Sequence, residues 1–350
     1  MSDTSGSSDR DEPRMRSSPE FELIAAIRER LAATAVGNGS GARIGIGDDA
    51  AVTINRPGAT AVSVDALVDG VGFRRSWCPP RSIGRKAVGA ALSDLAAMGA
   101  SPAEIYVWLG MPPDFGRDEC LELCDGLAEL AVREGAAVLG GDLTASGMLA
   151  VCVTAVGHAA SADAMIARSG AEPGYAVCVT GSFGGAAAGL MLLEHPELRE
   201  GLSERVESAV IARQLAPEPR LDAGRALAAG GARAMIDVSD GLGAEAEHLA
   251  AASGVGIEIE VDHVPCGEGV SEVADAAGRD PYELIVSGGE DYELLCVIPR
   301  AALADCRDAV EAAGTELHEI GRVVTGNAVR LRLPGGRSVP VAGHDHFRGF

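Results

Sequence analysis

Residues 79–99 read PPRSIGRKAVGAALSDLAAMG, and this stretch decides which folds the chain can adopt. Two prolines open it, a glycine closes it, and small or apolar residues fill its second half, so it predicts a helix over about Arg81–Met98. Ser93 and Asp94 stand together inside the apolar part. A charge among apolar neighbours needs a partner from elsewhere in the fold.

Strands and helices alternate on both sides of this helix. An extended run at Thr60–Leu67 precedes it, and a strand at Ile105–Leu109 and a helix at Arg117–Arg133 follow it. Similar spacing predicts helices at 20–35, 181–193, 203–214, 220–229, 242–252 and 301–313, and strands at 50–54, 137–139, 149–157, 176–180, 232–237, 256–261 and 292–298, with a closing β segment to residue 340. At roughly 150 residues per domain, the pattern predicts an α+β fold of two mixed α/β domains, 19–160 and 161–350, after a disordered tail at 1–18.

Composition excludes several classes of protein. The 51 acidic and 29 basic residues give a net charge of −22, which makes nucleic acid a poor partner. No window reaches the roughly 18 apolar residues of a membrane span, and the first 20 residues have no signal-peptide pattern. The eight cysteines are scattered, several in apolar runs, which indicates buried free thiols. We expect a soluble cytoplasmic protein.

The motifs of several common enzymes are absent. Lys86 is the only lysine and Ala87 follows it, so there is no P-loop and no strand-borne kinase lysine. Residues 45–50 match a dinucleotide-binding glycine pattern, but a strand follows where that motif opens a helix. The glycines of residues 181–189 leave two alternatives open: a phosphate cradle at a helix N-terminus, or close helix packing.

Aspartates instead gather in loops and at strand ends. They occur at Asp48-Asp49, Asp65, Asp94, Gly140-Gly141-Asp142 and Asp237-Val238-Ser239-Asp240-Gly241. Each one alone suits a turn or a helix cap, but oxygen ligands in this number favour hard cations, Mg²⁺ first. Several Mg²⁺ ions held by aspartates are suited to polyphosphate chemistry.

These segments resemble the thiamine-monophosphate kinase family, part of a superfamily with aminoimidazole ribonucleotide synthetase, selenophosphate synthetase and a hydrogenase maturation protein. The most specific matches are Ser287-Gly288-Gly289-Glu290-Asp291-Tyr292-Glu293-Leu294 and Asp345-His346-Phe347. The other matching segments, in the family's order, are residues 45–50, 63–65, 92–100, 140–142, 168–171 and 236–242.

The resemblance implies transfer of the γ-phosphoryl group of ATP to thiamine monophosphate, with several Mg²⁺ ions and no protein nucleophile. The acceptor phosphate is already ionised near neutral pH, so it needs no strong general base. The resemblance also implies two domains like those of aminoimidazole ribonucleotide synthetase: the first binds ATP and Mg²⁺ and pairs in a homodimer, and the second completes the active site.

Individual site residues follow from the same resemblance. It implies Mg²⁺ ligands at Asp49, Ser63, Asp65, Asp94, Asp142, Asp237 and Asp240, ATP contacts at Gly141, Asp142, Arg168 and Ser239, and substrate contacts at Gly72, Glu290 and His344. The chain departs from the family at Gly72, where histidine is usual, and at His344, where tyrosine is usual. Two alternatives stay open: a sister ATP-dependent enzyme of the superfamily, or a non-catalytic nucleotide-binding paralogue.

Overall fold

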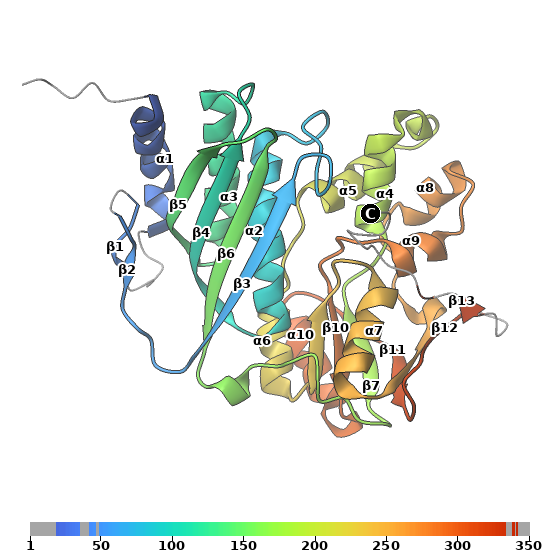
Figure 1. Cartoon of the computed structure of the whole chain (residues 1–350). Helices are drawn as coiled ribbons and strands as arrows, with labels where there is room; N and C mark the ends of the chain where they lie inside the picture. Colours follow the sequence, from blue (N-terminus) through green and yellow to red (C-terminus); the bar gives the residue numbers. More distant parts are fainter. Residues whose placement is uncertain (1–18, 36–41, 47–48, 334–337, 340, 342–350) are drawn as a thin grey trace, which may run out of the picture.

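The computed structural model describes residues 19–35, 42–46, 49–333, 338–339 and 341. These residues form a four-stranded sheet and a seven-stranded sheet that stand side by side, each packed against helices (Figure 1). The expected mixture of strands and helices in both halves of the chain is confirmed. The tail at 1–18 and the segment with His344 and residues 345–347 lie outside the described residues.

The first sheet has the strand order β3-β6-β4-β5. Its strands are β3 (Ala59–Val68), β4 (Ser101–Met111), β5 (Ala137–Ala145) and β6 (Ala150–Ala159). Strands β4 and β5 run parallel and the other neighbours antiparallel. Helices α2 (Pro80–Ala97) and α3 (Arg117–Arg133) cover one face, α1 (Pro19–Ala35) packs on α3, and the small pair β1 (Ala42–Ile44) and β2 (Val52–Thr53) lies on the side away from the second sheet (Figure 1).

The second sheet has the order β13-β12-β9-β11-β7-β10-β8. Its strands are β7 (Ala176–Thr180), β8 (Ala234–Asp237), β9 (Gly256–Glu260), β10 (Leu294–Ile298), β11 (Leu317–Val324), β12 (Val329–Arg332) and β13 (Ser338–Val339). Helix α7 (Leu242–Ser253) packs on one face, and α6 (Leu221–Gly230) and α10 (Leu303–Ala312) pack on the other.

A smaller helical layer sits beside this sheet around a core of its own. It consists of α4 (Gly185–Glu194), α5 (Glu204–Leu215), α8 (Val270–Ala276) and α9 (Pro281–Ser287). Short 3₁₀ turns lie at Ala162–Ala164, Pro196–Arg199, Val261–His263 and Arg300–Ala302.

Helix α2 is enclosed by both halves of the chain, with 13 of its 18 residues buried. Glycines allow this close approach: a Cβ on Gly84 would stand 2.1 Å from the Leu123 carbonyl oxygen of α3, and one on Gly224 of α6 would stand 2.0 Å from that of Ala96. A single apolar cluster therefore runs from α2 to the strands of the second sheet. Because interiors pack at high density, α2 has little freedom to shift against either sheet.

The sequence pattern predicted the long helices closely and the extent of several strands poorly. Helix α3 and strand β7 have the predicted bounds, whereas β5 continues six residues beyond the predicted end at Leu139, to Ala145. The seven-residue helices α8 and α9 were not predicted, because two turns are too short to display a clear apolar period. Among the described helices, none has the length and apolar character needed to cross a bilayer.

Candidate phosphoryl-transfer site

Two consecutive residues of α2 connect the two sheets. Ser93 is buried, and its Oγ donates a hydrogen bond to Oδ2 of Asp237, the last residue of β8, at 2.8 Å. Asp94 accepts a hydrogen bond from Ser63 Oγ of β3. The Asp94 carboxylate, which stands in an apolar helix, thus has the Ser63 hydroxyl as its partner. Through Ser93 and Asp94, α2 is hydrogen-bonded to one strand of each sheet.

The charges of four carboxylates act on the buried phenol of Tyr292 at this junction. Burial raises the pKa of Tyr292 well above its usual range, and the charges of Glu290, Asp65, Asp237 and Asp94 raise it further. Side chains alternate along a strand, so Asp65 faces α2 as Ser63 does. The structure therefore brings Asp65, Asp94 and Asp237 together from β3, α2 and β8.

The pKa of Asp237 is shifted by its burial and by the neighbouring carboxylates. Burial raises its pKa to about 7, the neighbouring charge of Asp94 adds to the increase, and the Ser93 hydrogen bond and the charge of Arg168 oppose it. Like charges held together away from water favour protonation unless cations neutralise them. A cation placed here would be strongly favoured.

The aspartate oxygens of this cluster fit a Mg²⁺ ion that takes only some of its ligands from the protein. Within the described ranges, no three His, Cys, Asp or Glu side chains form a preformed metal cage. Mg²⁺ usually takes only one or two carboxylates from the protein and completes its six ligands with water and substrate phosphates. Asp65, Asp94 and Asp237 could each supply a carboxylate to an ion of this kind.

The loop after β8 adds polar groups beside Asp237. Ser239 Oγ donates to Glu245 Oε1 at 3.3 Å, and the Asp240 amide donates to the same oxygen at 3.2 Å. Burial raises the pKa of Glu245, and the charge of the exposed Arg168 opposes that increase. Ser239, Asp240 and Arg168 thus accompany Asp237. Glu245 was not predicted, because it resembles an ordinary first-turn helix acid.

The carboxylates of the Ser287–Leu294 motif go to three different partners. Glu290 pairs with Lys86 of α2, with Nζ 2.8 Å from Oε1. Glu293 is fully buried and accepts hydrogen bonds from Arg213 (3.0 Å), Arg220 (2.7 Å) and Thr180 (2.8 Å). The motif therefore ties together α2, α5 and the start of α6.

The third carboxylate, Asp291, decides between the two alternatives for residues 181–189. Its oxygens accept hydrogen bonds from the amides of Gly184 (2.8 Å) and Ala186 (3.2 Å) at the N-terminus of α4. Those donors are the ones that a phosphate would use. In this conformation Asp291 uses these donors. The packing alternative is supported by Gly189, where a Cβ would stand 2.1 Å from the Val210 carbonyl oxygen of α5.

Backbone strain is concentrated in the same motif. Glu290 (φ 65°) and Tyr292 (φ 52°) are left-handed, which costs a non-glycine residue about 1–3 kcal/mol. The Glu290 amide donates to the Ser239 carbonyl at 2.7 Å, and the Tyr292 amide donates to that of Val238 at 2.9 Å. The strained segment is held against the loop that carries Ser239 and Asp240.

Gly141 and Asp142 do not join this group within one chain. They lie on β5, the edge strand farthest from β3, about 14 Å away at the usual strand spacing. Asp142 is in register with Trp108, whose side chain lies on the face of the sheet without a described helix, and accepts a hydrogen bond from Thr144 at 2.8 Å. Asp65 lies on the opposite face, towards α2.

The remaining predicted residues lie away from the cluster or outside the described ranges. Asp49 is exposed and follows a segment beside β5, where a Cβ on Gly45 would stand 3.8 Å from the Leu139 carbonyl oxygen. Gly72 lies in the turn after β3, where any Cβ would stand 2.8 Å from a methyl carbon of Leu67. A histidine there would require Leu67 to move. His344 lies outside the described residues.

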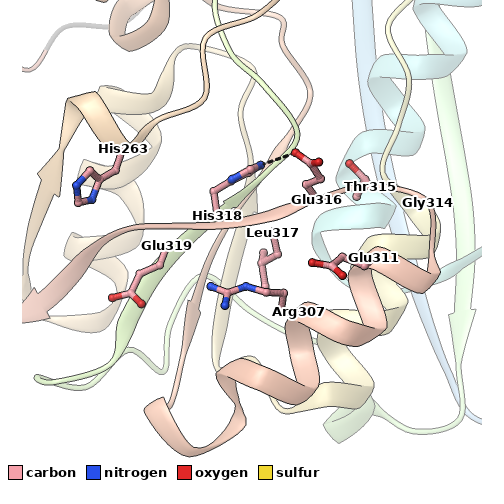
Figure 2. A pocket seen from close by; sticks show the side chains of 9 residues that line it. All are labelled: His263, Arg307, Glu311, Gly314, Thr315, Glu316, Leu317, His318 and Glu319. Carbon is pink, nitrogen blue, oxygen red and sulfur yellow. Dashed lines mark ion pairs between the residues drawn. The ribbon is translucent and has the colours of Figure 1, made fainter.

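A groove of about 830 Å³ lies over α10 and the start of β11 (Figure 2). Its lining includes both acids and bases, among them Arg307, Glu311 and His318. Figure 2 shows His318 turned towards Glu316, with Nε2 3.2 Å from Oε2. None of the predicted site residues lines this groove, so volume alone does not identify the site.

Comparison with known proteins places the fold in a defined group. The family models "AIR synthase related protein, N-terminal domain" and "AIR synthase related protein, C-terminal domain" match residues 47–159 and 172–334. The expected pair of domains is confirmed by these matches.

Individual relatives narrow the group further. The thiamine-monophosphate kinase of Mycobacterium tuberculosis is 37% identical over 305 residues, which are 87% of this chain and 86% of that one. The solved thiamine-monophosphate kinase of Stenotrophomonas maltophilia superposes with a TM-score of 0.80 at 31% identity, covering 90% of this chain and 97% of that one. AaThiL complexed with AMPPCP and TMP superposes with a TM-score of 0.73 at 31% identity, over 94% and 97% of the two chains.

Replacing Glu293 with glutamine should destabilise the protein by about 3 kcal/mol, because Arg213 and Arg220 would lose a buried counter-charge. Urea denaturation would measure the change. The matched control is Glu268→Gln, whose carboxylate pairs with the exposed Arg205 and should leave the midpoint unchanged. Equal midpoints for the two variants would contradict a structural role for Glu293.

Proposed function

Because the chain belongs to the AIR synthase related proteins, and within them to the thiamine-monophosphate kinases, we propose that it transfers the γ-phosphoryl group of ATP to thiamine monophosphate. The product is thiamine diphosphate. The observation that carries the proposal is the convergence of Asp65, Asp94 and Asp237 at the junction of the two sheets, in a chain with such relatives. AMPPCP and TMP are bound by one of those relatives.

Mg²⁺ is part of the proposal. Asp65, Asp94 and Asp237 would hold it with Ser63 nearby, and Asp240 would add a further carboxylate from the loop after β8. When bound, the ions neutralise the approach of two anionic reactants and the charge of the transferring group. The protein's own contribution is positioning, since an ionised acceptor phosphate needs no general base and no covalent intermediate.

We assign the other groups by the same reasoning. Arg168 and Ser239 stand beside Asp237 and are suited to the phosphates of ATP, because a guanidinium matches phosphate geometry. Glu290 would contact the thiamine group, and we propose the same role for Gly72 and His344. In this division residues 19–160 supply Asp65 and Asp94 for Mg²⁺ and ATP, and residues 161–350 complete the site with Asp237, Ser239 and Arg168.

The functional unit that we propose is a homodimer formed through the open face of the first sheet. Val62 (62% exposed), Val64 (64%) and Trp108 (38%) lie on that face. A contiguous apolar face of this kind usually marks an interface. Asp142 shares this face and Asp49 lies near its edge, so their Mg²⁺ role, and the ATP role of Gly141, would be exercised next to a second copy.

Introducing charged residues on the open face of the first sheet tests the proposed dimer. Val62→Asp with Val64→Asp should convert a particle of twice 35.6 kDa into one of a single chain, measured by sedimentation. Val132→Asp, at a valine exposed on α3, is the control and should leave the mass unchanged. A parent protein that sediments as a single chain at micromolar concentration would contradict the proposed dimer.

We place the protein in the cytoplasm, where the cell keeps thiols reduced, because all eight cysteines are free. The expected partners are ATP and thiamine monophosphate. A chain with a net charge of −22 is not expected to bind nucleic acid.

The activity is tested by incubating the protein with ATP, Mg²⁺ and thiamine monophosphate and following ADP and thiamine diphosphate. We expect product from the monophosphate and none from free thiamine or from aminoimidazole precursors. Asp65→Asn and Asp237→Asn should each reduce kcat by at least a hundredfold, because each removes a ligand charge. Neither should lower the thermal unfolding midpoint, since the buried charge of Asp237 is itself unfavourable to the folded state. Binding of Mg-ATP without turnover would favour a non-catalytic paralogue, and product from an aminoimidazole precursor would favour a sister enzyme.

A further inference from the structure

The chain's only lysine, Lys86, is fully buried in the middle of α2. Its Nζ lies 2.8 Å from Oε1 and 2.9 Å from Oε2 of Glu290, so both carboxylate oxygens are within reach of one ammonium group. A buried charge persists in a protein only when it is paired. Lys86 and Glu290 therefore depend on each other, although 204 positions separate them in the chain.

The surroundings of the pair restrict it further. Gln214 of α5 donates from Nε2 to Glu290 Oε2 at 2.6 Å, which fixes the carboxylate from a second direction. The Cys78 thiol lies near both charges: burial raises its pKa to about 12, with the charge of Lys86 opposing and that of Glu290 reinforcing the increase. The thiol is therefore neutral at physiological pH, so Glu290 is the group that neutralises the Lys86 ammonium.

The backbone at Glu290 shows why such a restraint is needed. Glu290 has a left-handed backbone conformation, and its amide donates a hydrogen bond to the Ser239 carbonyl. These two features fix the backbone and restrict the directions that the Glu290 side chain can take. The Glu290 side chain keeps 24% of its surface exposed, whereas that of Lys86 keeps none. Lys86 can therefore affect a ligand only through Glu290.

We propose that Lys86 is a positioning residue that fixes the Glu290 carboxylate at a set distance along α2 from the Asp94 end of the site. Eight residues of helix separate Lys86 from Asp94, a rise of roughly 12 Å. The helix then acts as a spacer between the group that contacts thiamine and the aspartates that handle the phosphates. This inference rests on the proposed function, in which Glu290 contacts the thiamine group.

Kinetics separate positioning from simple stabilisation. Lys86→Met removes the ammonium and retains most of the stem, and it should raise KM for thiamine monophosphate at least tenfold with KM for ATP within twofold of the parent. The matched control is Glu218→Gln, because Glu218 also links the second half of the chain to α2 and α3, through Arg85 and Arg133. This control should leave both KM values within twofold.

A double variant tests whether the two residues act as a unit. Lys86→Met with Glu290→Gln should be no worse than Glu290→Gln alone, within twofold in kcat/KM. An unchanged KM for thiamine monophosphate in Lys86→Met, an equal change in Glu218→Gln, or fully additive losses would each overturn the inference and leave the proposed function standing.

A second measurement observes Lys86 in the parent protein and so does not depend on whether Lys86→Met folds. Full-length protein labelled with ¹³Cε-lysine gives one lysine signal in an NMR spectrum, because the chain has one lysine. That signal should shift on adding thiamine monophosphate, stay in place with an ATP analogue alone, and lose its response in Glu290→Gln. A signal that ignores bound thiamine monophosphate would overturn the inference alone. A protein that neither binds nor phosphorylates thiamine monophosphate would overturn the proposed function and this inference with it.

Discussion

The burial of α2 between the two halves of the chain is the constraint on which the other features depend. Its glycine and alanine surface brings α3 and α6 into backbone contact, and its few polar residues then have defined partners. Ser93 reaches Asp237, Asp94 reaches Ser63, and Lys86 reaches Glu290. An apolar helix with three such polar residues can take only one rotation and one depth between the sheets, because every other placement leaves a buried polar group unpaired.

The same constraint creates the chemistry. The contacts that orient α2 also bring negative charges together where water is scarce, and burial and the charge of Asp94 raise the pKa of Asp237. A protein can accept this arrangement when a cation and its anionic substrate arrive together, because the metal then neutralises both. The surrounding segment 290–292 stores backbone strain and is held by partners on three elements, which is typical of a preorganised site.

Local sequence patterns predicted the elements and the residue types of the site, but not its assembly. The apolar period of residues 117–133 gave α3 its bounds, and the strand before Asp237 placed that residue at a sheet edge. Strand order is a non-local property, so nothing in the sequence indicated that Asp65 and Asp142 lie on opposite faces of one sheet.

The sequence also did not indicate which side chains would pair with one another. Lys86 served there only to exclude other folds, and the acids of the 287–294 motif gave no sign of their partners on α2, α4, α5 and α6. The glycines at 181–189 allowed a phosphate site until Asp291 proved to occupy the helix terminus. In each case the deciding fact is a contact between residues far apart in the sequence.

We propose that residues from β3, α2 and β8 form one cation site at the junction of the sheets. A crystal structure of the full chain with Mn²⁺, a non-hydrolysable ATP analogue and thiamine monophosphate would locate that site. We expect anomalous peaks between the nucleotide phosphates and the carboxylates of Asp65, Asp94 and Asp237. Metal and nucleotide bound elsewhere, with these three carboxylates free of both, would contradict it.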